Sequence, residues 1–238
     1  MRSLRKLVRE VIERSSEEPQ IWFLRRAKER VREPGGKLGI FASAFDPLTK
    51  AHLEIIERAR ARVDEILLLA DKRNADKEKS FASLEERLLM LLKFFDGWAK
   101  ISLGLSSHPL FLEKLRALKK VYSPGTSFCF LVGYDTIVRV LDRRYYQDRE
   151  AALDELFAEG EFLVAPRGSW GKEALLRFLE QGENQKFKEK VGFLEISDFA
   201  SSISSTQVRE RLRKGEHIQE LVPRRILELI GELNLYGG

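Results

Sequence analysis

The sequence has little of what builds extracellular or membrane-spanning proteins. Its 238 residues include one cysteine, Cys129, so a disulfide framework is excluded and a reducing compartment is favoured. The longest apolar runs fall far short of the ~20 residues that a transmembrane helix requires. The first residues, MRSLRKLVREVIERSSEE, are charged throughout and contain no apolar signal-peptide core. We therefore expect a cytoplasmic protein without a membrane partner, and we expect Cys129 to be packed in its core.

The excess of basic residues is small. Lys and Arg number 42 against 37 Asp and Glu, which gives a net charge of +5 and an isoelectric point near 9.3. Such a balance fits nucleic acid, phosphorylated metabolites or acidic partners. Because the chain carries no RGG tract, no zinc-knuckle spacing and no basic stripe with interleaved aromatic residues, nucleic acid is not the expected partner. The length fits one globular domain, or one domain with an appendage.

Two apolar patterns open the chain, and each roughly fits the spacing of one helix face. The first consists of Leu4, Leu7, Val8, Val11 and Ile12, and the second of Ile21, Trp22, Leu24 and Val31. The run Pro34-Gly35-Gly36 then ends this organisation. The patterns predict an N-terminal helical extension over residues 1–36. The remaining residues, 37–238, are predicted to form the main domain together with C-terminal helices.

From Lys37 onward, short apolar runs alternate with amphipathic segments. The pattern predicts strands at 38–43, 64–70, 100–104, 127–132, 161–166 and 191–196. It predicts helices at about 50–62, 83–97, 109–121, 135–142, 148–159, 171–181, 205–214 and 223–234. Runs such as EILLLA, FCFLVG and EFLVAP are typical of a parallel sheet that is covered by helices on both faces. We therefore predict an α/β fold with a doubly wound, Rossmann-like parallel sheet, in which ligands bind beyond the carboxyl ends of the strands.

The first strand-to-helix junction carries residues suited to phosphate. Pro47 keeps Asp46 extended, so no helix can begin before it. Thr49 is then a candidate N-cap, which puts His52 at about the third helical position. The start of a helix attracts anions, and a neutral histidine there can donate a hydrogen bond to a phosphate oxygen. The alternative is a plain cap with a histidine that is packed or on the surface.

The last junction, ISSTQVRERLRKG, has a similar character. Ser204, Ser205 and Thr206 are consecutive capping residues, and Arg209 follows one turn along the helix. Hydroxyl and free N–H groups beside an arginine would bind polyphosphate. A routine capped helix with solvated arginines is the alternative. A third stretch, RGSWGKEA, has the wrong spacing for a phosphate-binding P-loop, and we interpret it as a turn and a helix start.

These two junctions resemble the signature motifs of the nucleotidylyltransferase superfamily. The first motif of that superfamily reads G-G-x-F-D-P-x-(H/T)-x-G-H, and the chain matches it at Phe45, Asp46, Pro47, Thr49 and His52. The second reads I-S-S-T-x-(I/V)-R, and the chain matches it at Ile203, Ser204, Ser205, Thr206, Val208 and Arg209. Ala42, Ser43 and Ala51 replace the usual glycines. They keep the backbone N–H groups but adopt a positive φ less readily.

The resemblance implies a role for each matching residue, with His52 and Thr49 catalytic. The element Gly133-x-Asp135 resembles that of nicotinate and nicotinamide mononucleotide adenylyltransferases, where the Asp bonds a ribose hydroxyl; alternatively, Asp135 is a helix N-cap. The residues implied to bind ATP are Phe41, Ala42, Ser43, Phe45, Gly133, Asp135, Ser204, Ser205, Thr206 and Arg209. The acceptor would contact Lys72, Asn74 and Arg87, unless these belong to a solvated charged loop. Mg²⁺ would be bound mainly through the ATP phosphates, with no protein metal site expected.

The resemblance implies adenylyl transfer from ATP to nicotinamide or nicotinate mononucleotide, which gives the dinucleotide and pyrophosphate. A phosphopantetheine adenylyltransferase and a cytidylyltransferase are the alternatives within the same superfamily. A nucleotide-binding regulator without turnover is the alternative from a different class. The sequence leaves open which mononucleotide accepts, whether the chain forms a homo-oligomer, and what the N-terminal extension does.

Overall fold

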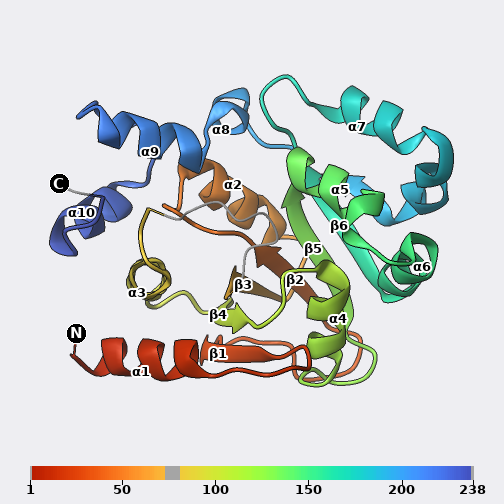
Figure 1. Ribbon diagram of the computed structural model, residues 1–238, viewed down its shortest axis with the longest axis horizontal. Coiled ribbons are helices and arrows are strands. Elements are labelled where there is room, and N and C mark those ends of the chain that lie inside the picture. Colours follow the sequence, from red (N-terminus) through yellow and green to blue (C-terminus); the bar gives the residue numbers. More distant parts are fainter. Residues whose placement is uncertain (1, 73–80, 237–238) are drawn as a thin grey trace.

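The computed structural model describes residues 2–72 and 81–236, which form a seven-stranded sheet with helices on both faces (Figure 1). The strands are β1 (Ile21–Arg25), β2 (Lys37–Ala42), β3 (Glu65–Asp71), β4 (Ile101–Ser106), β5 (Ser127–Gly133), β6 (Gly160–Ala165) and β7 (Val191–Phe193). The α-helices are α1 (Arg2–Glu13), α2 (Lys50–Ala59), α3 (Leu84–Phe94), α4 (Phe111–Lys119), α5 (Tyr134–Val140), α6 (Arg149–Glu159), α7 (Lys172–Leu179), α8 (Asp198–Ser202), α9 (Ser205–Arg213) and α10 (Arg224–Glu232). The 3-10 helices are η1 (Arg143–Tyr145) and η2 (Gly182–Lys190). Every helix in this described part of the chain is too short or too polar to span a membrane.

The order of the strands confirms the predicted doubly wound fold. Across the sheet it is β1-β4-β3-β2-β5-β6-β7, and all neighbours from β4 to β7 pair in parallel. Counted from β2 as the first parallel strand, this is the order 3-2-1-4-5-6 of the Rossmann fold. The chain changes direction across the sheet between β2 and β5. Ligands of such folds bind at this point, beyond the carboxyl ends of the strands.

Side chains alternate along each strand, so they pack into two separate hydrophobic cores, one on each face of the sheet. In β3, Ile66 and Leu68 belong to the core on one face, whereas Leu67 and Leu69 belong to the core on the other. The first core is completed by apolar residues of α1, α2, α3 and α10, and the second by those of α4, α5, α6 and α7. Cys129 is fully buried, as predicted. Each helix and strand predicted beyond residue 36 overlaps an observed one, whereas α8, η1 and η2 were not predicted.

The second predicted N-terminal helix is wrong, because residues 21–25 form an edge strand. β1 pairs antiparallel with β4, with Ile21 opposite Ser106 and Trp22 opposite Leu105. Its side chains alternate between the two cores, Ile21 on one face and Leu24 on the other. A run of Ile, Trp, Phe and Leu has high strand propensity, and its period of two fits these residues better than the helical stripe did.

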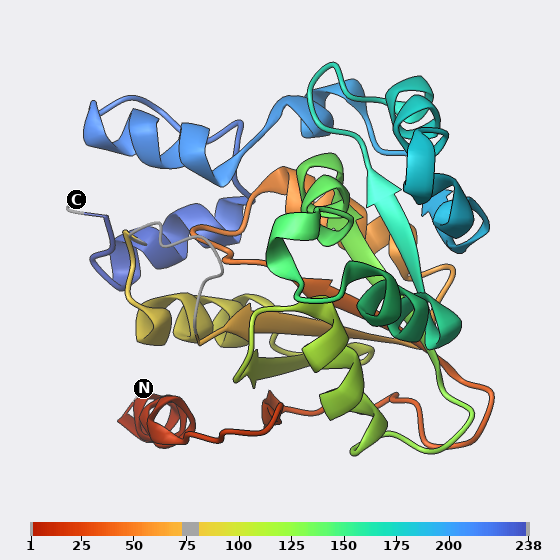
Figure 2. The same ribbon diagram turned by 45° about the vertical axis from the view of Figure 1, so that its right-hand side comes forward.

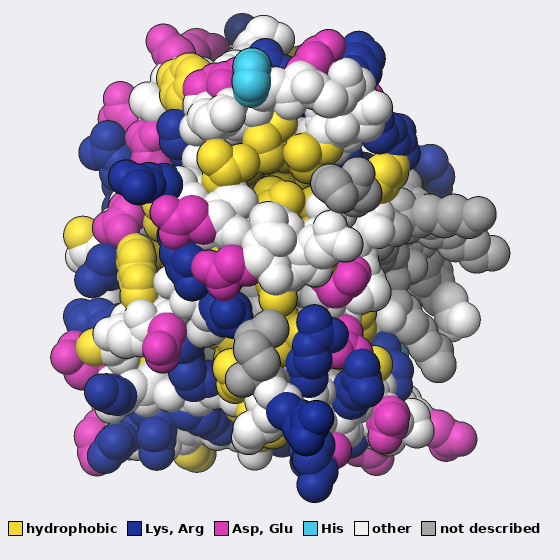
Figure 3. All heavy atoms as spheres, turned by 90° about the vertical axis from the view of Figure 1, so that its left-hand side faces the viewer, with side chains coloured by type: hydrophobic (Ala, Val, Ile, Leu, Met, Phe, Trp, Pro, Cys, Tyr) yellow, Lys and Arg dark blue, Asp and Glu magenta, His cyan; other side chains and the backbone are white. Residues whose placement is uncertain are grey.

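The first predicted helix is confirmed as α1. Its Val8 and Val11 are buried against the core that also holds α3. On the outer side, Arg5 and Arg9 pair with Glu85 of α3 at 3.2 and 2.8 Å. Figure 3 shows Lys and Arg side chains gathered at the lower end of this face, where Figure 1 places α1. The helix is therefore bound through its apolar stripe, and its basic side is left to solvent and to Glu85.

A buried carboxylate ties the N-terminal segment to the sheet. Glu65, with no exposed surface, accepts hydrogen bonds from the Val31 N–H at 2.9 Å and from the hydroxyls of Ser102 and Tyr122. The Ser102 hydroxyl in turn accepts the Ala27 N–H at 2.8 Å. Figure 2 shows the N-terminal segment, in red, running along the lower edge of the molecule. The Val31 N–H thus donates directly to the buried acid, and the Ala27 N–H binds the Ser102 hydroxyl that donates to it.

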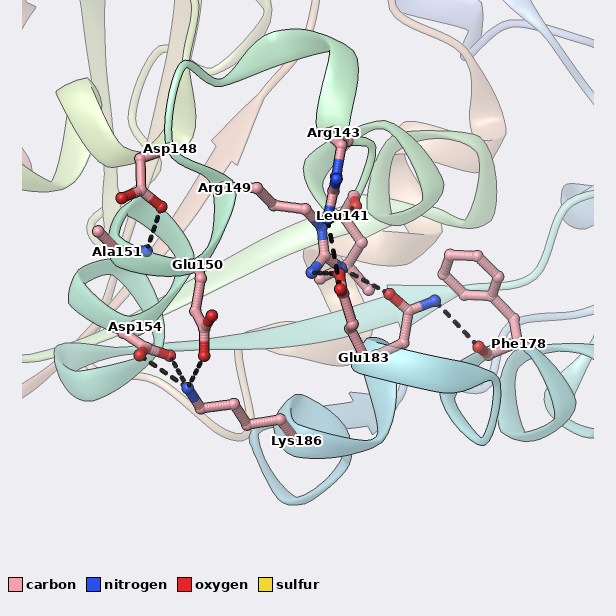
Figure 4. Close-up of polar contacts among 11 residues, drawn as sticks. Leu141, Arg143, Asp148, Arg149, Glu150, Ala151, Asp154, Phe178, Glu183 and Lys186 are labelled. Atoms are coloured by element: carbon pink, nitrogen blue, oxygen red, sulfur yellow. Dashed lines mark hydrogen bonds and ion pairs between the residues drawn. The ribbon is translucent and has the colours of Figure 1, made fainter.

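On the opposite half of the molecule, Arg149 fixes the end of α5. It is 9% exposed, and its Nε donates to the Leu141 carbonyl at 2.8 Å. Its other two nitrogens donate to Glu183 and Asn184 of η2 at 3.0 and 2.7 Å (Figure 4). One side chain therefore connects α5, α6 and η2, and it fixes the C-terminal end of the helix that follows β5.

The predicted division at residue 36 stays a prediction, and the contacts across it provide a direct test. We expect deletion of residues 1–34 to lower the free energy of unfolding by more than about 1–3 kcal/mol, the cost of leaving a buried carboxylate such as that of Glu65 without one of its hydrogen-bond donors. The edge of β4 and part of both cores would also become exposed. Urea denaturation against the full-length chain measures the loss. Deletion of residues 1–14 removes α1 but keeps β1 and the donors to Glu65, and it should cost less. An unchanged urea midpoint after the longer deletion would contradict this account.

Candidate active site

Thr49 and His52 hold each other at the first turn of α2. Thr49 is the N-cap, as predicted, and its Oγ1 accepts the His52 N–H at 3.4 Å. In return, the Thr49 N–H donates to Nδ1 of His52 at 3.0 Å. This reciprocal capping box satisfies two N–H groups at the start of the helix. Thr49 has no exposed surface and His52 is partly buried, so the two side chains are held in place at the switch point of the sheet.

The contact at Nδ1 decides which ring nitrogen of His52 carries the proton. A nitrogen that accepts from an N–H has no proton of its own, so the neutral ring is protonated on Nε2. That atom lies 3.3 Å from the hydroxyl of Ser43. Burial lowers the pKa of His52 from 6.5 to about 4, and the positive charge of Arg167 contributes to the same shift. At pH 7, His52 is therefore a neutral hydrogen-bond donor directed toward the loop after β2.

Phe41 of β2 and Phe45 of the loop that follows it pack against the His52 ring. The ring centroids lie 5.6 Å from Phe41 and 5.3 Å from Phe45. Phe41 is 4% exposed and Phe45 is fully buried. Their side chains therefore position the imidazole, and what they can offer a nucleotide is their backbone.

The residue with a left-handed backbone in this loop is Phe45, with φ of 47°. Such a conformation costs an L-residue roughly 1–2 kcal/mol. By contrast, Ala42, Ser43 and Ala51 are not among the described residues with a positive φ. The positions where the superfamily usually has glycine thus need no glycine backbone here, and the replacements add no strain to the loop.

The last junction packs directly on the first. All four predicted residues lie at the start of α9 or in its first turns: Ser204, Ser205, Thr206 and Arg209. The Ser205 hydroxyl donates to the Pro47 carbonyl at 2.9 Å. Arg209 donates to the Asp46 carbonyl at 2.8 Å and to the Thr206 hydroxyl at 3.1 Å. Two segments about 160 residues apart therefore meet, as ligand-binding motifs at one site must.

Asp135 lies beside open space at the end of β5. The N-cap of α5 is Gly133, so the alternative interpretation of Asp135 as the cap is wrong. The Asp135 side chain is 61% exposed, and its Oδ2 lies 3.6 Å from Nε of Arg167. A Cβ built on Gly133 would meet no atom within 4 Å. Both residues thus border a region that can admit a ligand at the switch point.

Arg167 is the residue of this site that the sequence analysis missed. It follows β6 at the same edge of the sheet, and its Nη1 donates to the Ile203 carbonyl. Together with its ion pair to Asp135, this contact connects the β5 junction to the last junction. The interpretation of this stretch as a turn and a helix start is confirmed, since Arg167 and Trp170 pair across a turn before α7. Its position directly after a strand was the signal that could have identified Arg167.

Two of the predicted acceptor residues make hydrogen bonds to backbone carbonyls of the protein itself. Arg87 is 4% exposed and donates to the Ala44 carbonyl at 2.6 Å, so it helps to hold the loop after β2 in place. Lys72 instead donates to the Arg14 carbonyl of the N-terminal segment. Asn74 lies outside the described residues. Contact of these three residues with an acceptor stays a prediction.

A known protein family matches the part of the chain that contains this site. The cytidylyltransferase-like family model matches residues 40–211, which is more than half of the chain and includes both motif junctions. The protein therefore belongs to the cytidylyltransferase-like family.

Individual relatives narrow the resemblance further. The chain is 28% identical over 232 residues to a Schizosaccharomyces pombe protein named "Putative nicotinamide mononucleotide adenylyltransferase", which covers 87% of this chain and 89% of that one. It is 24% identical to a "Probable nicotinate-nucleotide adenylyltransferase" of Clostridium tetani, over 84% of this chain and 98% of the relative. The solved Plasmodium falciparum nicotinic acid mononucleotide adenylyltransferase, complexed with NaAD, shares the fold with a TM-score of 0.63. The two chains are 21% identical, with 84% of this chain and 97% of that one covered.

We expect His52 to stay neutral, with its proton on Nε2, between pH 5 and 8. Nitrogen-detected NMR of the imidazole distinguishes the two tautomers and the charged ring. The pKa of the histidine is 6.5 in the unfolded chain and about 4 in the folded protein. Protonation of the unfolded chain should therefore lower the stability of the protein as the pH falls from 6.5 to about 4. A His52 titration with its midpoint near 6.5 would contradict the assignment.

Proposed function

We propose that the protein transfers the adenylyl group of ATP to nicotinamide or nicotinate mononucleotide. The observation that carries this proposal is the contact between the two motif junctions, in which Arg209 binds the Asp46 carbonyl beside the neutral donor His52. The names of the relatives support the acceptor class. The ordinary backbone at the replaced glycines removes the reason to favour a regulator without turnover.

The reaction needs no protein nucleophile. An oxygen of the acceptor phosphate attacks the α-phosphorus of ATP, a new P–O–P bond forms, and the bond to the β-phosphate breaks to release pyrophosphate. Such a transfer is accelerated by alignment and by stabilising charge as it moves. His52 would donate its Nε2 proton in a hydrogen bond to a non-bridging α-phosphate oxygen without giving up the proton. Thr49 keeps the ring in the tautomer that can do so.

The remaining ATP contacts follow from the position of each junction. Ser204, Ser205 and Thr206, at the start of α9, together with Arg209, would hold the departing pyrophosphate. Asp135 and the space at Gly133 would receive the ribose. Mg²⁺ would be bound mainly by ATP phosphate oxygens and would neutralise their charge. The described residues contain no cluster of three His, Cys, Asp or Glu that could hold a metal.

The decisive assay supplies ATP and Mg²⁺ with each mononucleotide separately and measures pyrophosphate and dinucleotide. Turnover with one or both confirms the activity and selects the acceptor. Binding of ATP without turnover on either mononucleotide would overturn the proposed acceptor class. Phosphopantetheine and a CTP-dependent reaction test the two alternatives within the superfamily.

His52→Ala should lower kcat on the order of 10²–10³-fold, by analogy with the loss of one oxyanion donor, and should change ATP affinity little. The reason is that its contact to the α-phosphate strengthens in the transition state. Steady-state kinetics and calorimetric ATP titration measure the two effects. Because glutamine at this position can retain the capping contact through its side-chain oxygen and still carries an amide N–H that can donate, His52→Gln should keep more activity than His52→Ala. Full activity of His52→Ala would refute the catalytic role.

Arg209→Ala should instead raise the KM for ATP, on the order of tenfold, because a charged hydrogen bond to phosphate is lost in ground and transition states alike. Arg224→Ala is the matched control, since this arginine side chain is 93% exposed and forms an ion pair with Glu228 at 3.2 Å. Equal KM values for the two variants would exclude Arg209 from the ATP site.

A further inference from the structure

The carboxylate of Asp46 is buried inside the first motif loop and is held from two distant parts of the chain. Asp46 is 2% exposed. Its Oδ2 accepts the Phe81 N–H at 2.9 Å, and its Oδ1 accepts the Ala82 N–H at 3.3 Å. Oδ1 also accepts the hydroxyl of Tyr236, near the C-terminus, at 2.7 Å. The last contact spans 190 residues and is the shortest of the three.

The sequence LNLY after α10 explains how the chain reaches this position. The Asn234 N–H bonds the Gly231 carbonyl at 3.1 Å, and the Leu235 N–H bonds the Ile230 carbonyl at 2.9 Å. With Asn234 at a φ of 51°, these contacts form a Schellman motif, which reverses the chain at the end of a helix. Leu235 is 2% exposed and anchors the turn in the core. The turn delivers the next residue, Tyr236, to the first motif loop.

Tyr236 is held there at a backbone cost. Its φ is 65°, a conformation that bulky residues adopt only where the surroundings impose it. Its ring packs against the core that contains α2, α3 and α10. Figure 1 shows α3 and α10 on its left side. Burial raises the pKa of Tyr236, and the negative charge of Asp46 adds to the shift. The hydroxyl therefore stays protonated and can only donate to this carboxylate.

We infer that Tyr236 is a positioning residue that fixes the first motif loop through Asp46. The inference rests on the proposed function. The Asp46 side chain is bound by Tyr236 while its carbonyl accepts Arg209, so a change at the tyrosine reaches the predicted pyrophosphate site through one residue. Three positions along the chain from Asp46, Thr49 sets the orientation of His52. The C-terminal turn thus restrains the segment that would align both ends of the triphosphate.

Tyr236→Phe tests this inference because it removes one oxygen atom and keeps the ring in place. The chain supplies a matched control in Tyr122→Phe. Tyr122 also donates its hydroxyl to a buried carboxylate, that of Glu65, at 2.9 Å. Glu65 begins β3, at the amino end of the strands and therefore away from the motif junctions. Both variants should lose similar stability in urea, so a difference in kinetics reports on the site and not on folding.

We expect Tyr236→Phe to lower kcat about tenfold, since small misalignment is costly in a reaction that depends on positioning. We expect Tyr122→Phe to leave kcat within twofold of the unaltered protein. Hydrogen exchange provides a readout without turnover: the amides of Phe81 and Ala82 should exchange on the order of tenfold faster in Tyr236→Phe only.

Unchanged kcat and unchanged exchange in Tyr236→Phe would overturn the inference, and so would equal losses of kcat in the two variants. If the unaltered protein turns over neither mononucleotide, the proposed function fails. The exchange of the two amides then still decides whether Tyr236 holds the loop.

Discussion

The reciprocal contact between Thr49 and His52 is the constraint on which the rest of the site depends. The hydrogen bond from the Thr49 N–H to Nδ1 of His52 caps helix α2 and selects the ring tautomer. It thereby directs the Nε2 proton toward Ser43. An ordinary capping box has glutamate or glutamine at this position. With histidine in its place, the element that starts the helix also becomes the donor that phosphate chemistry needs. Structure and proposed catalysis cannot be separated at this pair.

Besides the Asp46 carboxylate, three backbone carbonyls hold the first loop in place. Arg87 binds the carbonyl of Ala44, Arg209 that of Asp46, and the Ser205 hydroxyl that of Pro47. Contacts of this kind depend on the path of the chain and are indifferent to the side chain that each carbonyl carries. Alanine and serine can replace the usual glycines at positions 42, 43 and 51 because these residues are not among the described residues with a positive φ.

Sequence reasoning predicted what depends on local pattern and on motif. The parallel strands, the cap at Thr49 and the four residues of α9 follow from periodicity and capping chemistry. What it missed depends on contacts distant in sequence. β1 looked like a helix because its partner β4 lies some 80 residues away. Arg167 contacts Asp135 and Ile203, both distant in sequence, and Lys72 donates to the Arg14 carbonyl. No local pattern encodes these contacts.

In the proposed site, a neutral histidine and charged arginines have different electrostatic roles. Burial and, to a smaller extent, the charge of Arg167 lower the pKa of His52, so the ring stays neutral and remains a hydrogen-bond donor. A charged ring there would bind ATP tightly before the reaction, and uniform binding does not raise kcat. The arginines can instead supply constant attraction for a polyanion, while the neutral donor responds to charge as it shifts at the α-phosphorus. The low pKa is therefore a consequence of the same burial that aligns the ring, and alignment and charge state are set by one arrangement of side chains.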